Sequence, residues 1–282
     1  MIFLVKAACT TILDEIRGSY AAFRVTSKYS GPTVQIRRGN DDSTLNFYAN
    51  KQGQLGTSLD GSGTSLTQWL GGWQGYVVIW YDQSGQGRHA TQYTASSQPI
   101  FDPLNKRIDF TVQSGTAFLN LPDGTVPQRT QYTVTVKHNN INEPDGAWLS
   151  GGMTYINLGS NGFRRMSSSY RNWWWANDID ADGYASGNTV TFQYDGSARR
   201  AYVNGVYKST LESSAWNGAV GNEYIGKCPG WPYLNGELYF LHIFASSLDD
   251  QSRTLVESGL LESCQIGILH LSLLYASDLL KC

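Results

Sequence analysis

Charge is scarce in this chain. Only 16% of its 282 residues are Asp, Glu, Lys or Arg, and the formal net charge is −2. Electrostatic binding of nucleic acid needs a concentrated basic face. The Arg-Arg doublets are isolated along the sequence, at 37–38, 164–165 and 199–200. The composition therefore argues against a nucleic-acid-binding protein.

Cysteine is also sparse. The four cysteines, Cys9, Cys228, Cys264 and Cys282, show no Cys-x-x-Cys spacing and no paired histidines. This spacing argues against a structural zinc site. One or two disulfides remain open, and the cysteines do not define the redox compartment.

Long apolar runs are missing. The apolar run over residues 1–5 is shorter than the core of a signal peptide, so none is predicted. Residues 266–280 are rich in apolar side chains, but they include His270 and Asp278 and fall short of the ~20 apolar residues that span a bilayer. We expect no membrane span, and we interpret 263–282 as a tail that forms an amphipathic helix or docks on a partner.

Helix patterns are few. One short helix is expected at Thr10–Arg17, inside an N-terminal segment 1–17, and another at Ser247–Leu261, with Ser247 as its N-cap. The chain between them shows strand and turn patterns, with neither a low-complexity linker nor a repeat. We therefore predict one domain over 18–262.

The strand patterns are β-branched or alternating. They cover 133–136, 189–194, 201–203, 206–207, 223–225 and 236–244. Asn204-Gly205 between two of them is a strong hairpin signal, because both residues tolerate a positive φ. The stretch 52–67, rich in Gly and Ser, is expected to be a long surface loop. Many short antiparallel strands of this kind indicate an all-β architecture.

Two blocks of sequence resemble known families. Ile79–Gln92, which reads Ile-Trp-Tyr-Asp-Gln-Ser-Gly-Gln-Gly-Arg-His-Ala-Thr-Gln, resembles part of the α-L-arabinofuranosidase B catalytic domain. Arg200–Val206 and Tyr233–Phe244 look like the hairpin and closing strand of laminin-G-like domains. The resemblance implies a concanavalin A-like (laminin-G-like) antiparallel β-sandwich, or jelly roll, with short flanking helices.

The first block is also similar to blocks in tail, fibre and capsid-associated proteins of phages and large DNA viruses. That resemblance implies an extracellular or virion-surface location, with neighbouring subunits as partners. It also separates the fold from the hydrolase activity, because fold alone does not carry function.

Hydrolase activity needs carboxylates that this sequence does not place where the resemblance implies them. A retaining glycosidase uses two carboxyl groups about 5–5.5 Å apart. The arabinofuranosidase pattern has a Glu in a mid-chain strand segment and an Asp shortly after an Ile-Gly turn. Here Met166–Trp175 contains no Glu, and Lys227 follows Ile225-Gly226. Glu237 is expected at a strand edge, so no catalytic residue is assigned.

The sequence Asp82-Gln83-Ser84-Gly85 has two interpretations. With His89 nearby, Ser84 and Asp82 could form a catalytic triad. However, Asp-x-Ser-Gly after a strand is also ordinary turn chemistry, in which the Asp side chain accepts from backbone amides. No nucleophile-elbow pattern surrounds Ser84, so we predict a turn.

Aromatic residues make up 13% of the chain, and they cluster at Trp173-Trp174-Trp175. In a strand, Trp173 and Trp175 share a face, where indole rings could stack on sugars. If the sandwich closes as the resemblance implies, the same rim receives three more rings, and the predicted glycan-binding residues are Tyr170, Trp173, Trp175, Trp231 and Tyr233. The alternative is that the tryptophans are core or subunit contacts.

An acidic segment matches half of a calcium loop. Asp178, Asp180 and Asp182 alternate before Gly183, which suits a hard cation. The twelfth position is Thr189 rather than a bidentate Glu, which excludes an EF-hand. A weaker calcium site in a sandwich loop stays open beside the favoured interpretation, an acidic surface turn.

The function predicted from sequence is a non-catalytic carbohydrate-recognising or assembly module. The alternatives are an α-L-arabinofuranosidase-like glycoside hydrolase and a purely structural minor capsid or tail component. Expected partners are a glycan or neighbouring protein subunits.

Overall fold

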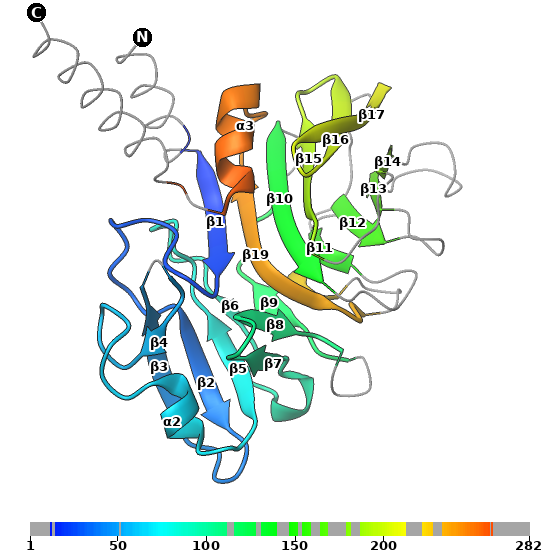
Figure 1. Cartoon of the computed structure of the whole chain (residues 1–282). Coiled ribbons are helices and arrows are strands. Elements are labelled where there is room, and N and C mark those ends of the chain that lie inside the picture. The colour runs from blue at the N-terminus through cyan, green and yellow to red at the C-terminus, as the bar shows by residue number, and fades with distance from the viewer. Residues whose placement is uncertain are drawn as a thin grey trace, which may run out of the picture.

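The computed structural model describes residues 12, 15–50, 52–111, 116–127, 131–139, 147–151, 154–158, 164–168, 179–181, 187–212, 222–227, 233–259 and 261. Every strand pair in these ranges is antiparallel, and the pairings trace two layers (Figure 1). Burial alternates along strands such as Leu119–Leu121, which bury one face, whereas Thr189–Tyr194 is buried at every residue, as expected for a strand covered on both faces.

Sheet 1 is the layer built mainly from the first half of the chain. Its strands lie in the order β4 (Leu55–Gly56), β3 (Thr44–Ala49), β2 (Val34–Arg38), β5 (Gly75–Trp80), β6 (Ala90–Thr91), β9 (Leu119–Leu121), β18 (Glu223–Ile225), β11 (Ala147–Gly151), β12 (Thr154–Leu158), β13 (Arg164–Ser168) and β14 (Ile179–Ala181).

Sheet 2 carries the closing strand near its edge. Its order is β1 (Ile16–Ala21), β19 (Glu237–Phe244), β10 (Tyr132–Asn139), β15 (Thr189–Tyr194), β16 (Ala198–Val203) and β17 (Val206–Glu212). The hairpin of β7 (Ile100–Asp102) and β8 (Arg107–Asp109) joins the two sheets, because β7 pairs with β5 and β8 pairs with β19.

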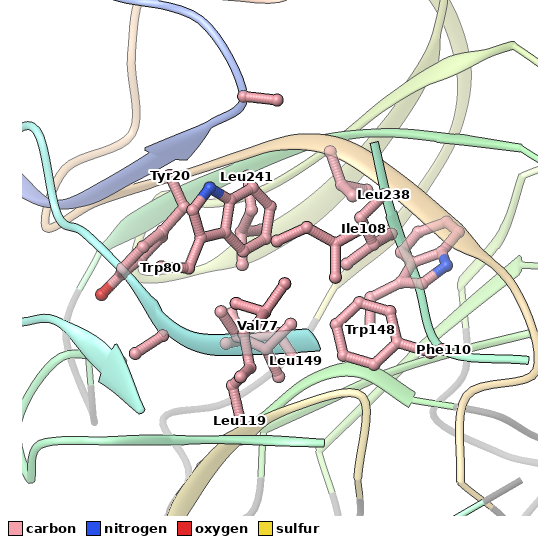
Figure 2. Packing of buried hydrophobic residues seen from close by; sticks show 14 of the residues in the cluster. Tyr20, Val77, Trp80, Ile108, Phe110, Leu119, Trp148, Leu149, Leu238 and Leu241 are labelled. Carbon is pink, nitrogen blue, oxygen red and sulfur yellow. The ribbon is translucent and has the colours of Figure 1, made fainter. Parts of the chain in front are cut away.

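The main core lies between the sheets (Figure 2). Trp80 of β5 packs against Tyr20 of β1, with ring centroids 5.8 Å apart. Leu119 and Leu149 enter from sheet 1, and Leu241 enters from sheet 2. Removing this much apolar surface from water at about 25 cal/mol per Å² is the main force that holds the two layers together.

A second, smaller cluster covers the outer face of sheet 2. Phe240 and Phe244 of β19 pack there with Val256 of α3 (Asp250–Glu257) and with Ile12 and Leu261. Figure 1 shows α3 beside β1, β19 and β10. The helix lies inside the predicted range, but its N-cap is Asp249 rather than Ser247, because the Asp249 carboxylate accepts from Ser252 N.

Local sequence patterns predicted several elements with their bounds. Strands β15 and β18 match the predictions, and β19 begins one residue later than expected. The β16–β17 hairpin turns at Asn204 and Gly205, whose φ angles are 49° and 78°. Two positive φ values at the turn match the right-handed twist of the paired strands.

Two elements differ from their predictions. The helix expected over Thr10–Arg17 is wrong at its end, because β1 begins at Ile16 and pairs there with Phe244 of β19. Tertiary pairing overrides a short helical pattern at that point. The stretch 52–67 is mostly loop, but it includes β4 and ends in the one-turn helix α2 (Leu66–Leu70), which starts at a capping box of Ser65 and Gln68.

No helix in the described ranges has both the length and the apolar character needed to cross a membrane.

Candidate functional site

Most of the predicted site residues lie outside the described residues. The predicted site residues outside the described ranges are Tyr170, Trp173, Trp175, Asp178, Asp182 and Trp231. Asp180 is placed only as a position in β14, in register with Arg165 of β13. Both the tryptophan site and the calcium loop therefore stay predictions. Within the described ranges, no group of three or more His, Cys, Asp or Glu residues could hold a metal ion.

Tyr233 is described, and it lies in a group of three aromatic side chains. Its ring centroid is 5.9 Å from that of Phe118, and the Phe118 ring meets Tyr224 edge-on at 5.6 Å. Edge-to-face and tilted pairs at these distances are favourable for aromatic rings. We call Phe118, Tyr224 and Tyr233 the aromatic cluster.

The side chain of Lys227 lies on the aromatic cluster. Its Nζ lies over all three rings, at 4.2 Å from the centroid of Phe118, 4.8 Å from Tyr224 and 5.5 Å from Tyr233. A cation at this distance is attracted by the negative face of each ring. The rings therefore favour this position of the half-buried Lys227 side chain.

Backbone hydrogen bonds explain how residues far apart in sequence form this cluster. Strand β18 pairs with β9, so that Tyr224 lies opposite Asn120. Gly226 then turns the chain with a φ of 83° and accepts a hydrogen bond from Leu234 N at 2.9 Å. That bond closes the loop that returns Tyr233 to the side of Lys227. Ser150 Oγ donates to the Lys227 carbonyl at 2.5 Å and fixes the turn on β11.

Gly226→Ala tests whether this turn depends on glycine. The added Cβ would lie 2.6 Å from the buried Phe110 ring, in a φ region that disfavours side chains. Gly124→Ala is the matched control, because Gly124 has a similar φ of 78° and no atom within 4 Å of the added Cβ. We expect Gly226→Ala to lower the free energy of unfolding by about 1–3 kcal/mol more than the control, measured by urea denaturation. Equal losses would show that the Phe110 contact does not restrict this position.

The aromatic cluster borders the outward face of sheet 1. Leu119 and Leu121 of β9 are buried, whereas Asn120 between them points outward and lies in register with Thr91 of β6. Tyr93 follows β6 and is 72% exposed. An exposed ring beside polar side chains is a surface that can bind an amphipathic ligand.

The same face continues across β5, β2 and β3. Ile79, Gln35 and Asn46 lie in one register row, and Asn46 Oδ1 accepts from Gln35 Nε2 and from Tyr81 Oη, both at 3.0 Å. No local pattern in the sequence singled out this row or Phe118, Tyr224 and Lys227. The alternation of Leu119, Asn120 and Leu121 was the available signal, since it predicts an outward polar position.

The structure confirms the turn at Asp82 and does not support a triad. Asp82 Oδ2 accepts from Ser84 Oγ at 2.7 Å, and Asp82 Oδ1 accepts from Ser84 N at 2.9 Å. His89 Nδ1 instead accepts from Asp82 N at 3.2 Å. Ser84 therefore donates to a carboxylate, and no hydrogen bond joins it to the histidine that a triad requires.

Buried carboxylates in the described ranges are engaged with other groups of the protein. Glu223 accepts from Gly124 N at 2.9 Å and from Val126 N at 2.7 Å, and burial raises its pKa. Glu237, expected at a strand edge, is the first residue of β19, where it pairs with Asp109 of β8 on one side and with Asn139 of β10 on the other. Its carboxylate pairs with Arg107 at 3.0 Å and accepts from Asn139 at 2.7 Å, while burial raises its pKa.

The fold is an all-β, concanavalin A-like antiparallel sandwich with short flanking helices. Solved arabinofuranosidases share it. A GH54 α-L-arabinofuranosidase soaked with a cyclic sulfate inhibitor superposes with a TM-score of 0.64 at 14% identity, over 89% of this chain and 63% of that one. An arabinofuranosidase complexed with arabinofuranosyl-α-1,2-xylobiose gives a TM-score of 0.63 at 13% identity, over the same shares.

This chain thus spans a little under two thirds of the length of those enzymes. At these identities the likeness shows the fold alone. No protein-family model matches the sequence, and no curated protein matches it.

Proposed function

We propose that this chain is a non-catalytic carbohydrate-recognising module and that its ligand docks at the aromatic cluster, on the half-buried rings of Phe118 and Tyr233, with the buried Tyr224 ring supporting them. The observation that carries the proposal is the position of these rings beside the outward polar row of sheet 1. Sugars present an apolar C–H face and a rim of hydroxyl groups. Aromatic rings suit the first, and amide and hydroxyl side chains suit the second.

The hydrogen bonds of the polar row support this proposal. Asn120 Nδ2 donates to the Thr91 carbonyl at 3.0 Å, which fixes the Asn120 side chain and leaves its Oδ1 as an acceptor. A pre-positioned amide loses little conformational entropy when a sugar hydroxyl binds. The Asn120 amide is therefore pre-positioned at the polar edge of the proposed site.

Among the described residues, the buried carboxylates are already engaged, which favours binding over hydrolysis. A glycosidase needs one carboxyl group free to act as nucleophile or base and another free to donate a proton. The Asp82 carboxylate accepts from the amide and hydroxyl of Ser84, and Glu223 accepts from two backbone amides. The Glu237 carboxylate forms an ion pair with Arg107. A hydrolase of the arabinofuranosidase type is the second candidate, and the shared fold is what favours it.

The proposal includes a location for the protein and a second class of partner. The resemblance of Ile79–Gln92 to virion proteins supports an extracellular or virion-surface location, where neighbouring subunits are further partners. In that setting the exposed ring of Tyr93 suits either a glycan or a protein contact.

Tyr233→Ala is expected to weaken glycan binding about tenfold, because it removes one stacking ring of the cluster. The measurement is a glycan-array screen of the purified chain, followed by calorimetry on the best ligand. Tyr207→Ala is the matched control, since Tyr207 is 53% exposed on β17 of the other sheet.

Both variants must keep the wild-type circular dichroism and unfolding midpoint. Equal affinity of the two variants would move the ligand away from the aromatic cluster. Wild-type protein that binds no glycan on the array would reject carbohydrate recognition and favour an assembly role. Release of arabinose from an arabinofuranoside substrate would favour the hydrolase.

A further inference from the structure

Lys227 holds a positive charge on the aromatic cluster, and no carboxylate of the described residues pairs with it. Its ammonium contacts rings, and no Asp or Glu of the described residues forms an ion pair with it. The adjoining segment 228–232 has no acidic residue in its sequence. The rings attract the cation but do not neutralise it.

The nearest acidic residue along the strand does not reach this charge. Glu223 precedes Tyr224 in β18, and successive strand residues face opposite sides of a sheet. Glu223 is accordingly directed to the turn at Gly124 and Val126, where it accepts two backbone hydrogen bonds. Among the described residues, Lys227 is therefore a cation without an ion-pair partner, in a chain whose formal charge is −2.

We propose that the ligand of the aromatic cluster is an anionic sugar, whose carboxylate or sulfate group pairs with the Lys227 ammonium while its ring stacks on Tyr233 and Phe118. This inference rests on the proposed carbohydrate-recognising function and adds the ligand class. A fixed, partly covered ammonium discriminates by charge, because an anion gains a charge-assisted hydrogen bond that a neutral sugar lacks.

The position of the ammonium supports this assignment. Gly226 and the hydrogen bond from Ser150 to the Lys227 carbonyl fix the backbone, and the rings fix the side chain. Part of the conformational entropy of the long lysine side chain is therefore lost before the ligand binds. A pre-ordered cation binds an anion more strongly than a freely rotating one does.

The test compares ligands that differ only in charge. Galacturonic acid oligosaccharides and their methyl esters have the same rings, and sulfated and neutral galactose oligosaccharides form a second pair. We expect the wild-type chain to bind at least one acidic member roughly ten- to a hundredfold more tightly than its neutral partner. The pair that shows the preference identifies carboxylate or sulfate as the bound group.

Three variants assign the preference to Lys227. Lys227→Gln should bring the ratio of acidic to neutral affinity close to one, and Lys227→Arg should keep it above one. Lys28→Gln removes an exposed lysine from a distant turn and should leave the ratio unchanged. Added salt should lower the acidic affinity of the wild-type chain through screening.

Each outcome separates the two proposals. Equal binding of acidic and neutral ligands, lost in Tyr233→Ala, would reject the anionic ligand and keep carbohydrate recognition. An acidic preference that survives Lys227→Gln would place the recognition elsewhere and overturn the role of Lys227. Absence of any glycan binding would overturn both proposals.

Discussion

Asp82→Ala is expected to lower the free energy of unfolding by about 3–5 kcal/mol, the largest effect predicted for a single substitution in this chain. The Asp82 carboxylate is buried and accepts four hydrogen bonds. Ser19 N and Ser84 N donate to Oδ1, both at 2.9 Å, while Ser84 Oγ and Arg88 N donate to Oδ2 at 2.7 and 3.0 Å. Alanine would leave these donors without their acceptor in a site that excludes water.

Asp60→Ala is the matched control for this prediction. Asp60 makes the same local contact, since its Oδ1 accepts from Ser62 N two residues later, but it lies in an exposed loop where water replaces the lost acceptor. We expect little change there. Urea denaturation of both variants measures the difference, and Asp82→Asn should fall between them. A loss for Asp82→Ala no larger than that for Asp60→Ala would show that Asp82 does not organise the fold.

Gln83, the residue after Asp82, also has a structural role in the block Ile79–Gln92. Gln83 is buried, and its side chain accepts from Val25 N at 3.1 Å and donates to the carbonyls of Ala21 and Phe23. Asp82 and Gln83 together fasten the loop after β5 to strand β1 and the segment that follows it. The Asp-Gln-Ser-Gly sequence is therefore a structural fastening, which a binding protein and an enzyme of this fold would both need.

His242 is expected to make the protein sensitive to mild acid. It is fully buried in β19, stacked on Phe240 with ring centroids 4.9 Å apart, and its Nδ1 lies 2.9 Å from Ser19 Oγ. Burial lowers its pKa from 6.5 to about 4. Below pH 6.5 the unfolded chain takes up a proton that the folded chain refuses, so stability falls as the pH drops toward 4, by a total of about 3 kcal/mol from this group.

His242→Gln should remove this part of the pH dependence. Urea denaturation of wild type and variant between pH 7.5 and pH 4 gives the difference in stability, in which the contributions of the other titrating groups cancel. That difference should shrink as the pH falls from about 6.5 to about 4. Ser19→Ala loses the contact to Nδ1 but retains the buried imidazole, so it should keep the wild-type slope. A constant difference for His242→Gln would mean that His242 does not control acid stability.

Local patterns predicted the elements whose signals lie within a few residues. The Asn204-Gly205 turn specifies its hairpin because both residues adopt a positive φ at low cost. The alternation along 189–194 predicts β15 at its observed bounds, and Asp-x-Ser-Gly at Asp82 predicts its turn. The helix at Thr10–Arg17 was wrong at its end because pairing of β1 with β19 outweighs a single turn of helical pattern.

The candidate site could be predicted only in part, since Tyr233 was named and its neighbours were not. Phe118 reaches Tyr224 only through the register of β9 with β18, and Lys227 reaches Tyr233 only because Leu234 N bonds to the Gly226 carbonyl. A shift of one residue in that register would turn each side chain to the opposite face. No short window of sequence contains that information.

The fold class can be predicted from the sequence, because alternation, turn chemistry and the Asp82 block are local properties of the chain. The sequence also placed a lysine after Ile225-Gly226, where the arabinofuranosidase pattern has an acid. The position of this lysine over three rings beside an outward polar row depends on tertiary packing. The reason is that strand register and loop closure are set by the packing of the whole sandwich.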